Sequence, residues 1–280
     1  MHLSYHIRFP VWKSIENCVS DIREWMDANR LKLNDSKTEA ILFGRKHHAS
    51  HISMSNVAIG DCKVNLCSST RDLGVILDSE LSMKDQIAAM CQSSHYHLTY
   101  ISRIRKYLTK SATETLVHAL ISSRLDYGNG FLYVVPKFLI KCLQSVQNSA
   151  ARIIARCGRY DHITPLLAEL HWLPVSSRII FKILLLTYKA LHGLAPAYIR
   201  DLLHLYVPSR SLRSSSDVLL RIPRSRLVSC GDRTFSYCAP RLWNNLPCEI
   251  RQSESLATFK SSLKTYLYKD AYLSLILHEL

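Results

Sequence analysis

Apolar side chains change their spacing near residue 81, and this change divides the chain into two differently built parts. Before it, short apolar runs bounded by turn signals predict a helix at 13–29, a strand at 38–43, a hairpin at 57–66 and a strand at 73–77. After it, apolar residues recur at helical spacing. Gly and Pro number only 8 and 9, which disfavours an all-β sandwich or barrel. The sequence therefore predicts an α+β fold that is mostly α, with a small antiparallel sheet followed by helices.

The second part is expected to be a series of helices separated by Gly and Pro signals. Ser111, followed three residues later by Glu114, forms a capping-box pattern, and Gly158 and Gly193 are expected to end helices. The predicted helices cover residues 81–107, 111–126, 137–157 and 176–192, a short stretch after Pro196, and residues 233–243 and 255–268. The expected domains are 1–80, 81–160 and 161–280.

Membrane insertion and a disulfide framework are both disfavoured. The longest apolar stretch, 179–191, is interrupted by Lys182 and Lys189, whereas a membrane span needs roughly 18 apolar residues in succession. Residues 1–12 lack the apolar block of a signal peptide. The 9 cysteines are scattered singly, which favours a reducing compartment.

The positive charge is concentrated in the middle of the chain. Residues 1–90 contain 11 basic and 11 acidic residues, whereas residues 91–241 contain 21 basic and 7 acidic ones. Of these 21 basic residues, 15 are Arg. The whole formal charge of +14 therefore lies in this middle segment. Such a field attracts polyanions, with nucleic acid as the first candidate and an anionic membrane surface as the second; a merely basic helical domain is the alternative.

No pattern of residues indicates a catalytic or metal site. The sequence has no Asp-Asp dipeptide, no phosphate-binding glycine loop and no paired C-x-x-C spacing. Asp78 and Glu80 are interpreted as exposed turn residues. Trp172 and Trp243 are expected in the core because apolar residues flank them. We therefore predict no catalytic residue and no metal ligand in this chain.

Rings and cations alternate at the end of the first long helix. Tyrosines there can either stack on bases or cover the core, and both alternatives stay open. In the helix at 137–157 the basic residues mostly lie off the apolar stripe, and residues 207–226 form a loop rich in Arg and Ser. The candidate nucleic-acid-binding residues are Arg103, Arg105, Lys106, Lys110, Lys137, Lys141, Arg152, Arg156, Arg159, Arg210 and Arg213, with Tyr96, Tyr100 and Tyr107 among the rings.

Several long sequence segments resemble one family of polymerases. The segments WMDANRLKLNDSKTEAILFG (25–44) and RDLGVILDSELSM (71–83) resemble the end of the palm in reverse transcriptases of LINE-type (non-LTR) retrotransposons, particularly the jockey-like group. Downstream segments such as HLTYISRIRKYLT, LVHALISSRLDYGNG and APRLWNNLPCEIR resemble the same family. The resemblance covers about residues 13–275.

The resemblance implies roles for parts of this chain. Lys37 matches a lysine near the incoming triphosphate, and Leu73, Gly74 and Val75 match the hairpin that grips the primer. Residues 81–158 match the helical thumb, and the remainder matches a C-terminal region that binds nucleic acid. The implied partners are RNA and DNA as a template–primer duplex, and the implied location is the cytoplasm and nucleus.

The chain also departs from the family. It has no counterpart of the palm aspartates that hold Mg²⁺, nor of the fingers and endonuclease, so it is interpreted as a truncated polymerase that is inactive alone. Three hypotheses follow. The chain binds nucleic acid without chemistry of its own; or it is a non-functional or domesticated remnant that acts through protein interactions; or an upstream half supplied in trans restores the enzyme.

Overall fold

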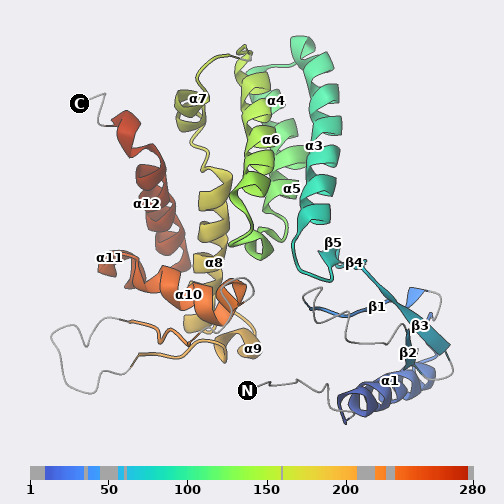
Figure 1. Ribbon diagram of the computed structural model, residues 1–280. Coiled ribbons are helices and arrows are strands. Elements are labelled where there is room, and N and C mark those ends of the chain that lie inside the picture. The colour runs from blue at the N-terminus through green and yellow to red at the C-terminus, as the bar shows by residue number, and fades with distance from the viewer. Residues whose placement is uncertain are drawn as a thin grey trace, which may run out of the picture. The chain divides into compact units, whose positions relative to one another are not determined.

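The computed structural model describes residues 10–34, 37–44, 56–59, 62–158, 160–206, 218–224 and 231–276. These residues form an α+β fold that is mostly α, which confirms the predicted class (Figure 1). The chain forms two compact units, Met1–Gln86 and Ile87–Leu280. Residues 87–160 and 161–280 belong to the same compact unit.

The first unit combines one helix with short strands. Its elements are α1 (Pro10–Ala28), β1 (Ala40–Ile41), β2 (Asn56–Ile59), β3 (Cys62–Cys67), β4 (Ser69–Asp72) and β5 (Val75–Asp78). The predicted hairpin is confirmed, because β2 pairs antiparallel with β3 and Ile59 lies opposite Cys62. The strand β1 instead pairs parallel with β3, so this sheet is mixed rather than purely antiparallel. Val64 is the buried centre of this unit's small core, and Val19 of α1 packs against it.

Leu73 and Gly74 form the turn of a second hairpin, between β4 and β5. Both residues have positive φ, 44° and 84°, as a tight turn between antiparallel strands requires. The predicted strand at 73–77 is therefore wrong at its start, and its partner β4 was not predicted. The reason is that β4, with the sequence STRD, carries no apolar alternation that would mark it as a strand.

The Asp78 carboxylate organises the connection from β5 to the following helix. It accepts hydrogen bonds from the main-chain N–H groups of Ser82 (2.8 Å), Met83 (2.8 Å) and Glu80 (3.2 Å). Partial burial opposes the charged form of Asp78, but these hydrogen bonds outweigh burial and lower its pKa below the ordinary 3.8. Leu81 and Met83 adopt positive φ in this connection, so the carboxylate holds a backbone that is unfavourable for such side chains.

Replacing Asp78 with Asn should loosen this connection. We expect faster amide hydrogen exchange at Ser82 and Met83, roughly tenfold, because charge-assisted hydrogen bonds are lost. In the unmodified protein the stabilisation is present above pH 3.8 and is lost as the pH falls through the lowered pKa of Asp78. Exchange measured by NMR over this pH range should show that dependence, and D78N should lack it. The exposed Asp27→Asn change is the matched control, and equal effects of both changes would contradict the assignment.

The second unit is built from helices, and Figure 1 shows α3, α4, α5 and α6 together in one part of it, with α8 packed against α6 and α12. The α-helices are α3 (Lys84–Ile104), α4 (Lys110–Val117), α5 (Ser123–Asp126), α6 (Lys137–Ala155), α7 (Ile163–Glu169), α8 (Val175–Leu191), α9 (Ala197–Arg200), α10 (Phe235–Asn244), α11 (Cys248–Arg251) and α12 (Leu256–Ile276). Shorter 3₁₀ segments are η2 (Arg105–Tyr107), η4 (Asn129–Leu132) and η5 (Gly231–Arg233), and η3 (His118–Ser122) is a π-helical turn.

Among the predicted helix boundaries that the structure corrects, two have a clear local reason. Thr109 rather than Ser111 caps α4, because the Thr109 hydroxyl accepts a hydrogen bond from the Ala112 N–H at 3.1 Å. At the end of α6, Arg156 rather than Gly158 takes the left-handed conformation, with φ 57°. The start of α8 and the turn at Gly193, with φ 70°, agree with prediction.

Aromatic side chains hold the C-terminal helices to the centre of the second unit. Trp243 of α10 and Phe259 of α12 are fully buried, and the Phe259 ring stacks on Tyr188 of α8 with centroids 4.3 Å apart. The Tyr272 hydroxyl of α12 donates a hydrogen bond to the carbonyl of Trp172. The prediction that Trp172 and Trp243 lie in the core is confirmed.

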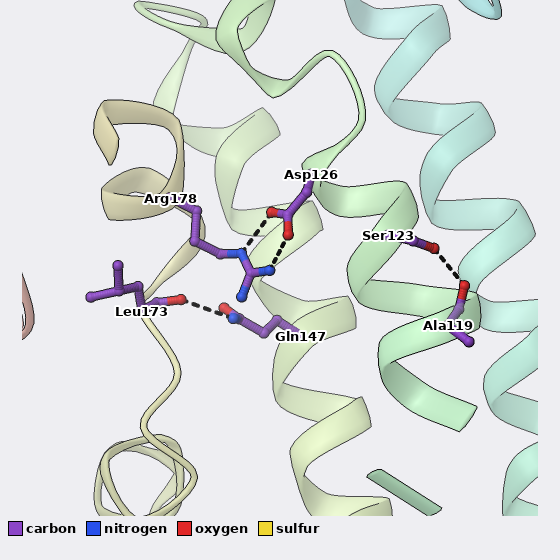
Figure 2. Close-up of polar contacts among 6 residues, drawn as sticks. All are labelled: Ala119, Ser123, Asp126, Gln147, Leu173 and Arg178. Atoms are coloured by element: carbon purple, nitrogen blue, oxygen red, sulfur yellow. Dashed lines mark hydrogen bonds and ion pairs between the residues drawn. The ribbon is translucent and has the colours of Figure 1, made fainter. Parts of the chain in front are cut away.

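Polar contacts fix α5 and α6 to the segment that begins α8. Figure 2 shows the Arg178 guanidinium facing both carboxylate oxygens of Asp126, with 2.8 Å between Nε and Oδ1. Figure 2 also shows the buried Gln147 side chain of α6 donating to the Leu173 carbonyl at 2.9 Å. A main-chain carbonyl buried in this position needs a donor, so Gln147 is a structural residue.

Replacing Gln147 with Ala should destabilise the second unit by about 1–3 kcal/mol, because the Leu173 carbonyl would lose its donor in a buried position. Urea unfolding followed by circular dichroism would measure the loss as a lower midpoint with an unchanged slope. The exposed Ser145→Ala change on the same helix is the control, with an expected effect within about 0.5 kcal/mol. A Gln147 variant as stable as this control would contradict the role.

Candidate nucleic-acid interface

The helix α3 buries one side and presents tyrosines on the other. Ile87, Leu98 and Ile101 are buried, whereas Tyr96 and Tyr100 are exposed by 59% and 49%. Tyr107 in η2 is exposed by 77%. The sequence leaves open whether these three tyrosines cover the core or lie on the surface. The structure places all three rings on the surface. We call Tyr96, Tyr100 and Tyr107 the tyrosine stripe.

Cations lie over the rings of this stripe. The Tyr96 and Tyr100 ring centroids are 4.7 Å apart. The Arg103 guanidinium lies 5.7 Å from the Tyr100 centroid, and the Lys106 ammonium lies 4.7 Å from the Tyr107 centroid. A hydrogen bond with Tyr100 raises the pKa of Tyr96, so this hydroxyl is neutral at physiological pH. The surface therefore offers aromatic rings beside positively charged side chains.

Arg105 has a structural role that the sequence did not reveal. Its Nε donates to the Ile153 carbonyl at 2.9 Å, and its Nη2 donates to the Ile154 carbonyl at 2.8 Å. Its Nη1 donates to the Leu108 carbonyl at 2.7 Å. The guanidinium thus fastens η2 to the last turn of α6, and its donors face main-chain oxygens. We therefore reassign Arg105 from a phosphate contact to a positioning residue.

The exposed cations next to this junction form what we call the basic end: Arg103, Lys106 and Arg156. The Arg156 Nη2 donates to the Arg105 carbonyl at 3.2 Å, which places it beside η2. Arg152, half-buried on α6, donates through Nη2 to the Asp161 carbonyl at 3.4 Å. Asp161 contributes the opposite charge here, and its carboxylate accepts a hydrogen bond from the Gly158 N–H. The structure therefore brings three exposed predicted cations together at one end of the α3–α6 pair.

Other predicted cations do not join the basic end. Lys110 forms an ion pair with Glu169 of α7 at 3.0 Å, and this hydrogen bond and charge raise its pKa. Lys137 and Lys141 are exposed on the first turns of α6, a helix that spans roughly 28 Å, so they lie far from Arg156 at its other end.

The remaining predicted positions fall elsewhere. Arg159, Arg210 and Arg213 lie outside the described residues. Lys37 is exposed in the first unit, where its N–H donates to the Asn34 carbonyl at 3.1 Å. Leu73, Gly74 and Val75 belong to the β4–β5 hairpin, with Leu73 exposed at the turn and Val75 buried.

Sequence reasoning missed Tyr160, which is exposed by 93% and directly precedes Asp161, whose carbonyl accepts a hydrogen bond from Arg152. The only sequence signal for it was an aromatic residue next to basic residues, since Tyr160 follows Arg156 and Arg159 closely in the sequence. Within the described ranges, no group of three or more His, Cys, Asp or Glu side chains is placed to hold a metal ion. In that same part of the chain, no helix is long and apolar enough to cross a bilayer.

Comparison with family models, with curated proteins and with solved structures gives no match to this chain.

Replacing Arg105 with Ala should lower the free energy of unfolding by about 2–4 kcal/mol, because three main-chain carbonyls lose a charged donor. Arg105→Lys should recover only part of this loss, since one ammonium cannot reproduce the fork of a guanidinium. Urea unfolding is the measurement. The control is Arg103→Ala, two residues away on the surface, with an expected loss of at most about 0.5 kcal/mol. Equal losses for Arg103 and Arg105 would contradict the structural assignment.

Proposed function

We propose that this chain binds nucleic acid, as the palm end, thumb and C-terminal region of a LINE-type reverse transcriptase. The observation that carries the proposal is the basic end. Arg103, Lys106 and Arg156 are exposed there and lie next to a junction that Arg105 holds in place. Phosphate groups are the ligands that such clustered, solvent-facing cations bind.

The charge around the basic end supports a polyanionic ligand. No Asp or Glu occurs between Gln86 and Thr113, a segment that includes η2 and all of α3 after its first turn, where Asp85 lies. The excess positive charge of the chain also lies in residues 91–241, a segment of the second unit. A field of one sign accelerates the approach of a polyanion and strengthens its binding at low salt.

The family assignment rests on the sequence segments, and local structure is compatible with the roles they imply. The residues proposed to grip the primer, Leu73, Gly74 and Val75, lie at the turn of a hairpin. The residues proposed as the thumb, 81–158, are helical except for short connections. The location in cytoplasm and nucleus stays a prediction from the family.

The proposed role of these 280 residues is binding rather than nucleotide addition. The sequence contains no Asp-Asp pair, and the described side chains include no group of three or more His, Cys, Asp or Glu placed to hold a metal ion. In the family, Mg²⁺ would stabilise the attacking and leaving oxygens of the displacement. We assign no metal-dependent step to the residues of this chain.

A second candidate function is a protein-interaction module, and the surface of α1 favours it. Ile22 and Trp25 are exposed by 46% and 63% although helical spacing predicts them on the apolar side of α1. Apolar side chains left exposed together mark a surface for a partner. Absence of any salt-dependent affinity for nucleic acid would favour this second function.

The binding proposal predicts a strong salt dependence. The logarithm of affinity for a dye-labelled duplex should fall linearly with the logarithm of salt concentration between about 50 and 200 mM. Combining Arg103→Ala, Lys106→Ala and Arg156→Asn should make the slope shallower by about 0.9 for each phosphate contact removed. Asn is chosen at position 156 because it tolerates the left-handed conformation found there. Fluorescence anisotropy measures both quantities.

The matched control removes the same number of charges from α12. Lys260, Lys264 and Lys269 are exposed on that helix, away from the α3–α6 junction in sequence, and their replacement by Ala lowers the net charge equally. We expect the control to keep most of the slope. A control that weakens binding as much as the basic-end variant, or binding that ignores salt, would overturn the proposal.

A further inference from the structure

We propose that the tyrosine stripe of α3 and η2 binds an unpaired strand of nucleic acid by stacking on its bases. This inference rests on the proposed binding of nucleic acid and names the form of ligand that the stripe takes. In this proposal Tyr96, Tyr100 and Tyr107 stack on bases, whereas the cations of the basic end bind phosphates.

The stripe has the geometry of a stacking surface. Tyr96, Tyr100 and Arg103 follow one another at i, i+4 and i+7, which places them along one side of α3, and Tyr107 lies in the 3₁₀ segment that directly follows this helix. From Tyr96 to Tyr107 the axis advances about 18 Å, at about 1.5 Å per residue in α3 and about 2.0 Å per residue in η2. Three rings along such a line can meet several successive bases of one strand.

The form of the nucleic acid follows from what the rings can reach. In a duplex the flat faces of the bases are covered by their neighbours, so a surface ring meets a base face only at an end or on an unpaired strand. Phosphates are accessible in both forms, and the cations of the basic end do not distinguish them. The exposed rings therefore supply the preference for an unpaired strand.

Charge distinguishes this ligand from a second copy of the chain. Arg103 and Lys106 lie over the stripe's own rings, and no acidic residue occurs from Gln86 to Thr113. Two such surfaces brought face to face would repel each other, since the part of each that carries the rings, after the first turn of α3, has only positive formal charge. A strand with phosphates outside and bases turned toward the rings complements both properties of the surface.

The contrast with the buried tyrosines supports the same conclusion. The hydroxyls of the buried Tyr188 and Tyr272 and of the half-buried Tyr268 donate to main-chain carbonyls and connect the helices. Tyr96 and Tyr100 instead interact with each other on the surface, and neither ring is needed to fill the core. Their replacement is therefore expected to leave the fold unchanged.

The test compares an unstructured single-stranded oligothymidine with a blunt duplex carrying the same number of phosphates, both dye-labelled. Changing Tyr96, Tyr100 and Tyr107 together to Ala should weaken binding of the single strand at least tenfold, because each stacked base contributes about 1–3 kcal/mol. Affinity for the duplex should change less than about twofold. Because stacking releases no counterions, the salt slope should stay as in the unmodified chain.

The matched variant changes the same three residues to Phe, which keeps the rings and removes the hydroxyls. We expect it to bind the single strand like the unmodified chain. Circular dichroism and the thermal midpoint should be unchanged in both variants, so that loss of binding is not loss of folding. Sedimentation of the free chain tests the competing occupant: self-association that the Ala variant abolishes would overturn the inference in favour of a contact between copies.

The two proposals fail in distinguishable ways. If the unmodified chain binds duplex with a steep salt slope but the Ala variant keeps its affinity for the single strand, the stacking inference is overturned and nucleic-acid binding stands. An equal loss for duplex and single strand also overturns the inference. If neither probe binds at low salt, the proposed function is overturned, and the inference falls with it.

Discussion

The guanidinium of Arg105, donating to three main-chain carbonyls, joins the end of α3 and η2 to the end of α6. Carbonyls at a helix C-terminus carry partial negative charge and lack partners within the helix, so a half-buried cation there satisfies them and opposes the helix dipole. Arg103, Lys106 and Arg156 owe their closeness to this junction. Arg105 thus has a structural role, whereas the neighbouring cations Arg103, Lys106 and Arg156 are exposed to solvent.

The second unit uses its aromatic residues in two separate ways. In the core, Trp243, Phe259 and Tyr188 pack together, and tyrosine hydroxyls such as that of Tyr272 reach main-chain carbonyls. On α3 the rings face outward and are accompanied by cations. The buried apolar side chains stabilise the second unit, and the exposed tyrosine rings of α3 do not contribute to this core.

The sequence predicts helices well where apolar spacing and burial agree. Val117, Ile121 and Leu125 recur at helical spacing within the predicted helix 111–126 and are all buried, although this stretch contains a π-helical turn. Boundaries were less predictable, because Thr109 and Ser111 are both acceptable caps and only the hydrogen bond to Ala112 distinguishes them. The role of Arg105 could not be predicted, since two of its three acceptors lie 48 and 49 residues away along the chain and a basic residue in a basic run gives no local signal. The exposure of Tyr96 and Tyr100 was equally open, because the same helical spacing serves a core and a surface.

The π-helical turn at His118–Ser122 sets the angular position of everything after it in the same helical rod. One extra residue in a turn rotates the following residues by about 100° around the axis. Asp126 lies just beyond that turn and meets Arg178 of α8 through both carboxylate oxygens. The π-helical turn therefore sets the direction in which Asp126 points toward Arg178 of α8. Deleting or inserting one residue in this turn would rotate Asp126 away from Arg178, whereas exposed side chains of the same helices can change without this effect.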